Sequence, residues 1–233
     1  MIKIEKFNEL AKKLGLEFKD IHILAKAFTH RSYLNEHRNS GLEHNERLEF
    51  LGDAVLELAV TNFLYKTYPK KPEGDMTAYR SALVNAVTLA TVAETLGLNN
   101  YLLLSKGEAK DTGRARQYIL ANTIEALIGA IYLDQGYDAA AKFIDDHVHV
   151  LIHDVIEKKK FIDSKSLFQE MAQEHTSTTP RYELMKEFGP DHDKVFTVGV
   201  FLGDVHIANG EGKSKQEAET QAAHKALTVK KWG

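Results

Sequence analysis

Apolar residues recur at steps of three and four through the first two thirds of the chain. This spacing occurs in Phe7, Leu10 and Leu14; in Leu48, Leu51, Val55 and Leu58; in Leu83, Val87 and Ala90; in Ile124, Leu127 and Ile131; and in Phe143, Val148 and Ile152. It is typical of amphipathic helices, whereas a half-buried strand would alternate with a period of two. The pattern predicts consecutive helices over residues 4–160, with a loop marked by Pro69, Pro72 and Gly74.

The pattern changes after about residue 163. Residues 164–175 form an amphipathic sequence, and three short runs rich in β-branched and aromatic residues follow at 181–185, 194–202 and 204–208. The glycine-rich stretch 209–212 predicts a turn into a last helix over 214–230. We therefore expect a multidomain protein: an all-α domain at 1–157, a linker at 158–163, and a small α+β (α-β-β-β-α) domain at 164–233.

Composition limits the chemistry that the chain can perform. Its 233 residues are 43% hydrophobic, which favours one or two folded domains. The 30 Lys and Arg are balanced by 33 Asp and Glu, and residues 163–233 alone hold nine basic and eleven acidic residues. A nucleic-acid partner must therefore be bound through local patches. Because cysteine is absent, a metal site must use carboxylates, amides or histidines.

No stretch has the continuous apolar core of a signal peptide or the length of a membrane span. The longest apolar stretches are interrupted by Glu57 or by glycine. The absence of cysteine also fits a reducing compartment. We expect a cytoplasmic protein with no membrane partner.

Four acids lie close together on one predicted helix. Glu46, Glu49, Asp53 and Glu57 are at i, i+3, i+7 and i+11, so their side chains form a stripe. Like charges at this spacing repel one another unless a cation neutralises them. The plainest interpretation is a solvated acidic face with Arg47 and nearby lysines as counterions.

Two features favour a functional site over a solvated face. Gly52 lies inside the acidic helix, where it costs about 1 kcal/mol relative to alanine, which indicates that something approaches the backbone closely. Asn122 and Glu125 are three residues apart in a second, mostly apolar helix, so they share a face that can converge on the stripe. Oxygen ligands of this kind suit Mg²⁺ or Mn²⁺.

The segment Asn45-Glu-Arg-Leu-Glu-Phe-Leu-Gly-Asp resembles the signature of ribonuclease III, an endonuclease specific for double-stranded RNA. The likeness covers nearly the whole chain. It includes Phe28-Thr-His-Arg-Ser-Tyr, Leu83-Val-Asn, Gly113-Arg-Ala-Arg, Glu125-Ala-Leu-Ile-Gly-Ala and Tyr132-Leu-Asp. The resemblance implies a helical endonuclease that processes ribosomal and messenger RNA precursors and leaves 5′-phosphate and 3′-hydroxyl ends.

The resemblance also assigns roles by position. The family's metal-site positions fall on Glu49, Asp53, Asn122 and Glu125, with Mg²⁺ expected and Mn²⁺ as a substitute. Catalysis is expected from Asp53 and Glu125, and Glu46 and Glu73 match further acids of the family's processing centre. Phe50 matches a residue that docks into the partner subunit of a homodimer; an ordinary core role is the alternative.

One departure concerns Asn122, where the family usually has aspartate. An amide oxygen can still bind Mg²⁺, but it adds no negative charge and exchanges no proton near neutral pH. Metal affinity is expected to fall, or the preferred metal to change. Asn122 could be a natural variant in an active enzyme, a natural loss of activity that leaves a silent or weakened RNA-binding protein, or an engineered substitution.

The C-terminal domain resembles a double-stranded RNA-binding domain, with its strongest match at Gly210-Glu-Gly-Lys-Ser-Lys-Gln-Glu-Ala-Glu. There the helix amides with Lys213 and Lys215 can meet phosphates, while Gln216 replaces a lysine common in relatives. The resemblance assigns RNA contacts to Gln169 and Gln173 on the first helix and to His192 in the loop between strands.

A group of three histidines, His147, His149 and His153, invites interpretation as a metal site. Only His149 and His153 share a helix face, and no further ligand lies near them in the sequence. We therefore interpret this group as a solvated helix end.

Overall fold

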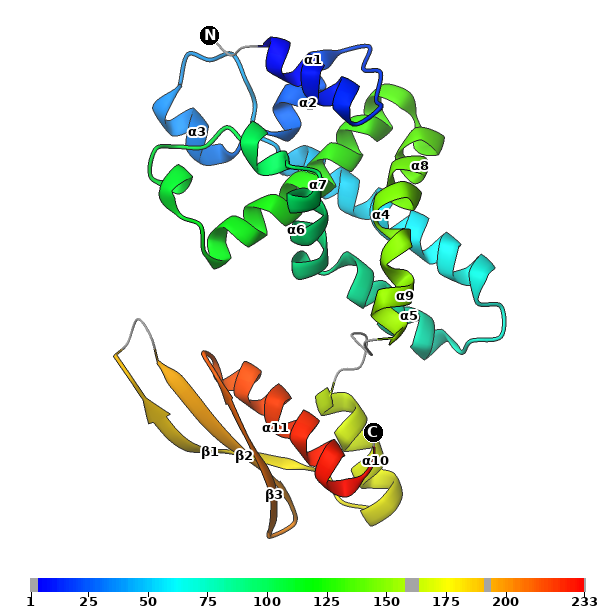
Figure 1. The fold of residues 1–233 in the computed structure, drawn as a ribbon, viewed down its shortest axis with the longest axis vertical. Helices are drawn as coiled ribbons and strands as arrows, with labels where there is room; N and C mark the ends of the chain where they lie inside the picture. Colours follow the sequence, from blue (N-terminus) through cyan, green and yellow to red (C-terminus); the bar gives the residue numbers. More distant parts are fainter. Residues whose placement is uncertain (1–3, 158–163, 191–193, 233) are drawn as a thin grey trace. The chain divides into compact units, whose positions relative to one another are not determined.

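The computed structural model describes residues 4–157, 164–190 and 194–232, and the chain forms two compact units, Met1–Phe161 and Ile162–Gly233 (Figure 1). The expected linker at 158–163 lies outside the described residues. Each unit has its own hydrophobic core. Within the described ranges, no helix combines the length and the apolar character that crossing a membrane requires.

The first unit is helical, as predicted. Its α-helices are α1 (Ile4–Lys13), α2 (Ile21–Ala27), α3 (Arg31–Glu36), α4 (Glu46–Thr67), α5 (Glu73–Val84), α6 (Ala86–Thr95), α7 (Arg114–Gln135), α8 (Tyr137–His147) and α9 (Ile152–Glu157). Short 3-10 helices span Leu98–Tyr101, Glu108–Lys110 and His149–Leu151. Thr29 and Leu103 form an isolated parallel bridge.

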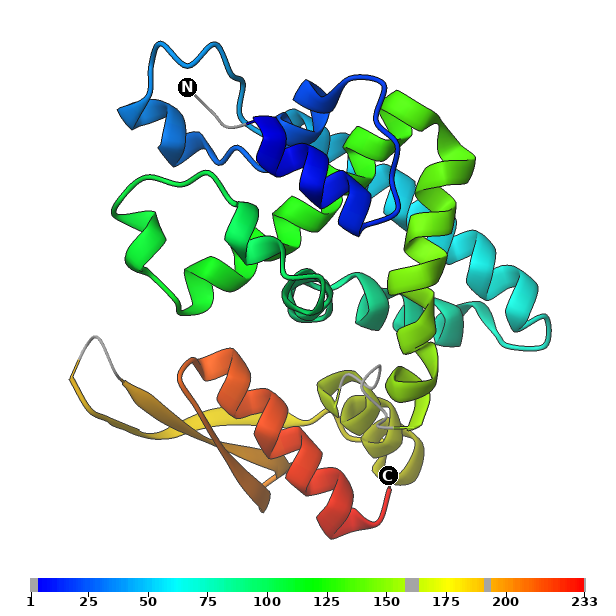
Figure 2. The same cartoon turned by 45° about the horizontal axis from the view of Figure 1, so that its top comes forward.

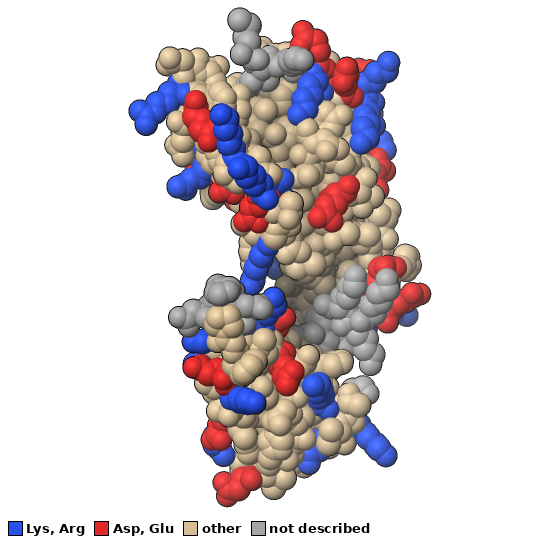
Figure 3. All heavy atoms as spheres, turned by 60° about the vertical axis from the view of Figure 1, so that its left-hand side comes forward, with Lys and Arg blue, Asp and Glu red and all other residues tan. Residues whose placement is uncertain are grey.

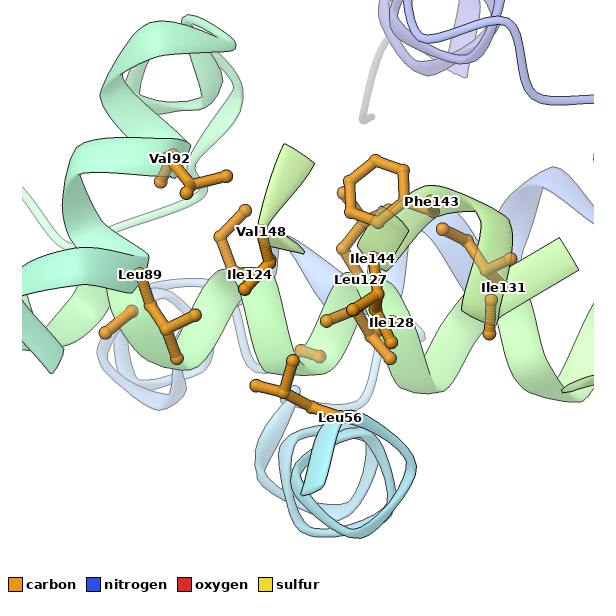
Figure 4. Close-up of a cluster of buried hydrophobic side chains, with 14 of the residues drawn as sticks. Leu56, Leu89, Val92, Ile124, Leu127, Ile128, Ile131, Phe143, Ile144 and Val148 are labelled. Carbon is orange, nitrogen blue, oxygen red and sulfur yellow. The ribbon is translucent and has the colours of Figure 1, made fainter. Parts of the chain in front are cut away.

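Helix α7 lies at the centre of this unit and packs against α4, α6 and α8 (Figure 1). Figure 4 shows side chains from these helices meeting around α7, with Leu56 on α4, Leu89 on α6 and Phe143 on α8. Burial of these apolar side chains, at about 25 cal/mol per Å², holds α4 and α7 against each other. The predicted acidic helix and the helix of Asn122 and Glu125 are therefore direct neighbours.

The second unit has the predicted α-β-β-β-α order. Its elements are α10 (Ser164–Thr176), β1 (Arg181–Phe188), β2 (Val195–Leu202), β3 (Val205–Gly212) and α11 (Lys215–Lys230). The strands pair antiparallel in the order β1-β2-β3, and both helices lie on one side of the sheet (Figure 2). Phe168, Val200 and Ala222 meet in the core between them.

Two details of the sequence interpretation were wrong. Gly74 lies inside α5 and not in the loop. Residues 209–212 belong to β3 and do not form a turn. A glycine is needed at 212 because a Cβ there would lie 2.7 Å from the amide nitrogen of Ala218 in α11. These glycines let a strand and a helix touch. Leu58 and Val87 have helical spacing but are 58% and 60% exposed.

Candidate functional site

Helices α4 and α7 cross with their backbones in contact at two glycines. A Cβ on Gly52 would overlap the carbonyl oxygen of Glu125 and lie 2.8 Å from the amide nitrogen of Gly129. A Cβ on Gly129 would in turn overlap the carbonyl oxygen of Leu48. The close approach that Gly52 predicted is confirmed, and its counterpart is the backbone of α7.

This crossing brings carboxylates from two helices together. Glu49 and Asp53 flank Gly52 on α4, and Glu125 is the residue of α7 that Gly52 touches. Burial, together with the smaller effect of the negative charges of Asp53 and Glu49, raises the pKa of Glu125 to about 7. Because a charge acts over a short range in the protein, this pKa shows that the three acids form one electrostatic cluster.

Asn122 belongs to the same cluster. The pKa of Glu49 is raised by burial and then by Glu46 and Asp53, and a hydrogen bond from the Asn122 side chain opposes the rise. Asn122 and Glu49 are both half-buried. The sequence prediction that Asn122 and Glu125 share a face directed at α4 is thus confirmed.

The donor set suits a hard divalent cation, because half-buried carboxylates with mutually raised pKa values are stabilised by a positive ion. In the described part of the chain, however, no three His, Asp or Glu side chains are arranged closely enough to hold a metal ion. The chemistry of the residues fits a cation, whereas their positions in this structure do not enclose one.

The other acids of the stripe have separate environments. Glu46 begins α4 and lies 3.7 Å from the guanidinium group of Arg31, while its charge also reaches Glu49. Glu57 pairs at 2.9 Å with Arg80 of α5. Arg80, and not the expected Arg47, is therefore the counterion at this end of the stripe, and Glu57 is a structural acid.

Glu73 is not brought to the cluster of its own chain. It starts α5, where its carboxylate accepts a hydrogen bond of 2.8 Å from the Thr77 hydroxyl. It lines a hollow with Leu64 and Tyr65 of α4. At 1.5 Å per helical residue, Leu64 lies on the order of 17 Å along α4 from Asp53. Within one chain, Glu73 therefore lies too far from Asp53 to join the metal-site candidates.

Phe50 points away from the core and is 82% exposed, so the alternative of an ordinary core residue is excluded. Beside it lies a hollow lined by Leu48, Leu51 and Leu133, with Lys26, His44, Glu46 and Arg47 at the rim. Leu58 and Tyr65 continue the exposed apolar surface along the same face of α4. A large aromatic side chain in water beside an apolar hollow is typical of an interaction surface.

Asn45, which precedes the acidic helix, has a role that its sequence context did not reveal. An asparagine there predicts an N-cap, yet its side chain makes no capping bond. Instead its amide donates to the carbonyl of Ala27 at 3.2 Å, and its backbone N–H donates to Thr29 at 2.9 Å. Asn45 is buried and fixes the first turn of α4, which carries Glu46 and Glu49.

The candidate RNA contacts lie on exposed parts of the second unit. Gln169 and Gln173 are exposed on α10 and line one hollow with Ser166. Lys213 and Lys215 flank Ser214, the N-cap of α11. The carboxylate of Glu217 accepts the backbone N–H of Lys213 at 2.9 Å, which joins the residue after β3 to the first turn of α11. His192 lies outside the described residues.

Basic residues do not form one continuous surface on the face shown in Figure 3, where Lys and Arg side chains are interspersed with Asp and Glu on both units. This arrangement agrees with the near-neutral composition. Contact with a polyanion would depend on single placed side chains.

The interpretation of the histidine group as a solvated helix end was wrong for His149. This residue is 5% exposed, stacks on Phe63 with ring centroids 4.1 Å apart, and bonds to Asp145 through Nδ1. Burial lowers the pKa of His149. The residues around His149 in the sequence do not predict its burial, because its stacking partner, Phe63, lies on α4.

Comparison with known proteins agrees with both units. The family described as Ribonuclease-III-like matches residues 20–151, and the double-stranded RNA binding motif matches residues 164–230. A ribonuclease 3 of Pelotomaculum thermopropionicum is 46% identical over 223 residues, covering 96% of this chain and 92% of that protein. A ribonuclease 3 of Carboxydothermus hydrogenoformans is also 46% identical, over 97% of each chain.

Solved structures show the same likeness for the first unit. The nuclease domain of a Campylobacter jejuni ribonuclease III is 38% identical with a TM-score of 0.55, and the match covers 61% of this chain and 95% of that one. That structure is described as showing flexibility in a region involved in dimer formation.

Proposed function

The chain belongs to the ribonuclease III family of double-stranded-RNA endonucleases, and we propose that it hydrolyses RNA duplexes with a divalent cation held where α4 crosses α7. The observation that carries this proposal is the convergence of Glu49, Asp53 and Glu125 around the contact of Gly52 with α7. Mg²⁺ is the proposed ion, and Mn²⁺ is its substitute. Asn122 would offer its amide oxygen.

In the proposed reaction, the oxygen of a water molecule adds to phosphorus and the bond to the 3′ oxygen breaks, which leaves 5′-phosphate and 3′-hydroxyl ends. A bound divalent cation would stabilise the negative charge that develops on the phosphate and lower the pKa of the attacking water. Glu125, whose pKa in the metal-free site is about 7, would be held in its deprotonated form as a ligand of the bound cation. Asp53, exposed beside it, would complete the catalytic pair.

We propose that the working form is a homodimer joined through Phe50 and the hollow beside it. The exposed aromatic ring and the apolar lining support this arrangement. A second copy would also offer its own Glu73, which the geometry keeps from the cluster of its own chain. Glu46, at the start of α4, is the proposed counterpart of Glu73 at the edge of the site.

The second unit would hold the RNA duplex. The proposed contacts are Gln169, Gln173 and His192 in the minor groove and Lys213 and Lys215 on phosphates. Ribosomal and messenger RNA precursors in the cytoplasm are the proposed substrates, and the absence of cysteine supports a reducing compartment.

A second function is favoured by one observation, the uncharged Asn122 in the cluster. With one negative charge fewer, the protein could bind duplex RNA with little or no cleavage. The test incubates the protein, Asn122→Asp and Glu125→Gln with a long RNA duplex and Mg²⁺ or Mn²⁺. Cleavage by the unaltered protein and its loss in Glu125→Gln support the enzyme. A gel shift without cleavage, with cutting only by Asn122→Asp, supports the binding protein. Single-stranded RNA is the substrate control.

A further inference from the structure

Arg80 of α5 binds two residues of α4 through two nitrogens of its guanidinium group. Its Nε lies 2.9 Å from a carboxylate oxygen of Glu57, and a terminal nitrogen donates to the Thr61 hydroxyl at 3.0 Å. Glu57 and Thr61 are one turn apart on α4, so the planar group is held at two points and its orientation is fixed. Because Thr61 carries no charge, the second bond contributes orientation rather than charge balance.

The face of α5 that binds α4 also carries Glu73. Glu73 and Arg80 are seven residues apart, which is nearly two full turns and about 10 Å along the helix axis. Thr77 lies between them, and its hydroxyl donates to the Glu73 carboxylate at 2.8 Å. The buried residues of α5 all follow position 78 and lie on a different face. Arg80 therefore adds an attachment that restrains rotation of the helix and so the position of Glu73.

Arg80 also has a possible role within its own chain. Glu57 is one turn after Asp53 on α4, so an unpaired Glu57 would place another negative charge beside the acidic cluster. The two roles differ in which cluster they serve. Charge balance through Glu57 acts on the cluster of the same chain, whereas orientation of Glu73 acts on the cluster of a second copy.

We propose that Arg80 is a positioning residue that fixes α5 against α4, so that Glu73 reaches the acidic cluster of a second copy of the chain. This inference rests on the proposed homodimer and extends it, because it identifies what holds Glu73 in place. Displacement of a catalytic group by about 1 Å can cost 100-fold in rate. The Arg80 and Glu57 side chains are 35% and 39% exposed, so loss of their ion pair should leave the chain folded.

The test places Arg80→Ala and Glu125→Gln in mixed dimers, which are isolated with two different affinity tags. In one arrangement each chain carries one substitution, and in the other one chain carries both while its partner is unaltered. A dimer of an unaltered chain with a Glu125→Gln chain is the reference, since it retains one intact cluster. The measured quantity is the rate at which one strand of an RNA duplex is cut in Mg²⁺.

The two arrangements should differ if Arg80 acts through Glu73. The dimer with one substitution in each chain should cut at the reference rate, because its intact cluster faces the unaltered α5 of the other chain. The dimer with both substitutions in one chain should cut up to about 100-fold more slowly. The opposite result would overturn the proposal and assign Arg80 to the cluster of its own chain. Equal rates in both arrangements, fast or slow, would also overturn it.

Glu73→Gln in place of Arg80→Ala separates this failure from failure of the proposed homodimer. If Glu73→Gln gives equal rates in both arrangements, Glu73 does not act in the second copy, and the dimer proposal falls together with the inference. If only Arg80→Ala gives equal rates, the inference alone falls. Lys142→Ala removes an exposed ion pair with Asp146 within α8 and should reach the reference rate in both arrangements.

A distance measurement tests the same proposal without cleavage. The chain has no cysteine, and a Cβ at Gly74 would meet nothing within 4 Å, so Gly74→Cys can carry a nitroxide label beside Glu73. Double electron–electron resonance gives the distance between the two labels of a dimer. Arg80→Ala should shift or broaden this distance, and Lys142→Ala should not. An unchanged distance in Arg80→Ala would show that Arg80 does not position the start of α5.

Discussion

Gly52 of α4 lies directly against the backbone carbonyl group of Glu125 in α7, with no room between them for a Cβ. The contact sets the distance between the two helices that supply the acidic cluster. Asp53 follows Gly52 in the chain, and Glu125 supplies both the contacting carbonyl and the buried carboxyl group. Packing and electrostatics at this site therefore depend on the same two residues.

Gly52→Ala should separate α4 from α7 and disperse the carboxylates. Overpacking in a closed core costs typically 1–3 kcal/mol, and the contact with backbone, which cannot rotate aside, places this case at the upper end. Urea unfolding should show this loss. Cleavage of a duplex should fall more than the unfolded fraction explains, since displacement of a catalytic group by about 1 Å can cost 100-fold.

Gly74→Ala is the matched control, because Gly74 lies inside α5 and an added Cβ there would meet nothing within 4 Å. It should leave activity unchanged and raise stability by up to about 1 kcal/mol. Equal effects of the two substitutions would show that the contact between Gly52 and Glu125 does not determine the site.

The sequence predicted the close approach at Gly52 because a glycine in the middle of a helix destabilises that helix unless a neighbouring backbone needs the space. It could not separate Glu57 from the other acids of the stripe, since all four share the same local spacing. Only the fold shows that Arg80, from the next helix, neutralises Glu57. The charge of a residue can be read from the sequence, whereas its ion-pair partner is known only from the fold.

The role of the glycines within residues 209–212 could not be identified from the sequence. Glycine is favoured both in turns and where two backbones touch, and the local sequence does not distinguish these uses. Gly210 and Gly212 touch α11, which follows them in the chain. Likewise, Leu58 has the helical spacing of its apolar neighbours but is 58% exposed, because periodicity does not reveal whether a second surface covers a helix face.

The contribution of Glu125 to the stability of the metal-free protein should be lost as pH rises from about 4.5 to about 7. Glu125 has a folded pKa of about 7 against an ordinary value of 4.5, so the native state binds more protons than the unfolded state across this interval. Unfolding free energies in EDTA should show the decline, and Glu125→Gln should reduce it. A variant with the same pH dependence as the unaltered protein would exclude Glu125 as its source.

Phe50→Ala should weaken the proposed dimer. Removing a central aromatic contact typically costs 2 kcal/mol or more, which corresponds to about a 30-fold higher dissociation constant by sedimentation equilibrium. Val87→Ala, which shortens a side chain that is 60% exposed on α6, is the control. If both variants dimerise as tightly as the unaltered protein, Phe50 lies outside the interface.

His149 should make the protein sensitive to acid. Burial lowers its folded pKa below the ordinary 6.5, so below about pH 6.5 the unfolded state gains a proton that the folded state resists. The contribution to stability is complete above this pH and is lost as pH falls through the folded pKa. His149→Phe keeps an aromatic ring on Phe63 and should flatten the acid limb of a urea-unfolding profile. The exposed His153→Gln should not.

Lys213 and Lys215 should each contribute to the salt dependence of RNA binding. When a lysine neutralises a phosphate, it releases a counterion, so each alanine substitution should reduce the slope of log K against log salt by about 0.7–0.9. Lys225→Ala is the matched control, because Lys225 is exposed on α11 ten residues beyond Lys215, which is about 15 Å along the helix axis. Binding to a short duplex in EDTA, measured at several salt concentrations, avoids cleavage. A full slope in both variants would mean that other groups bind the phosphates.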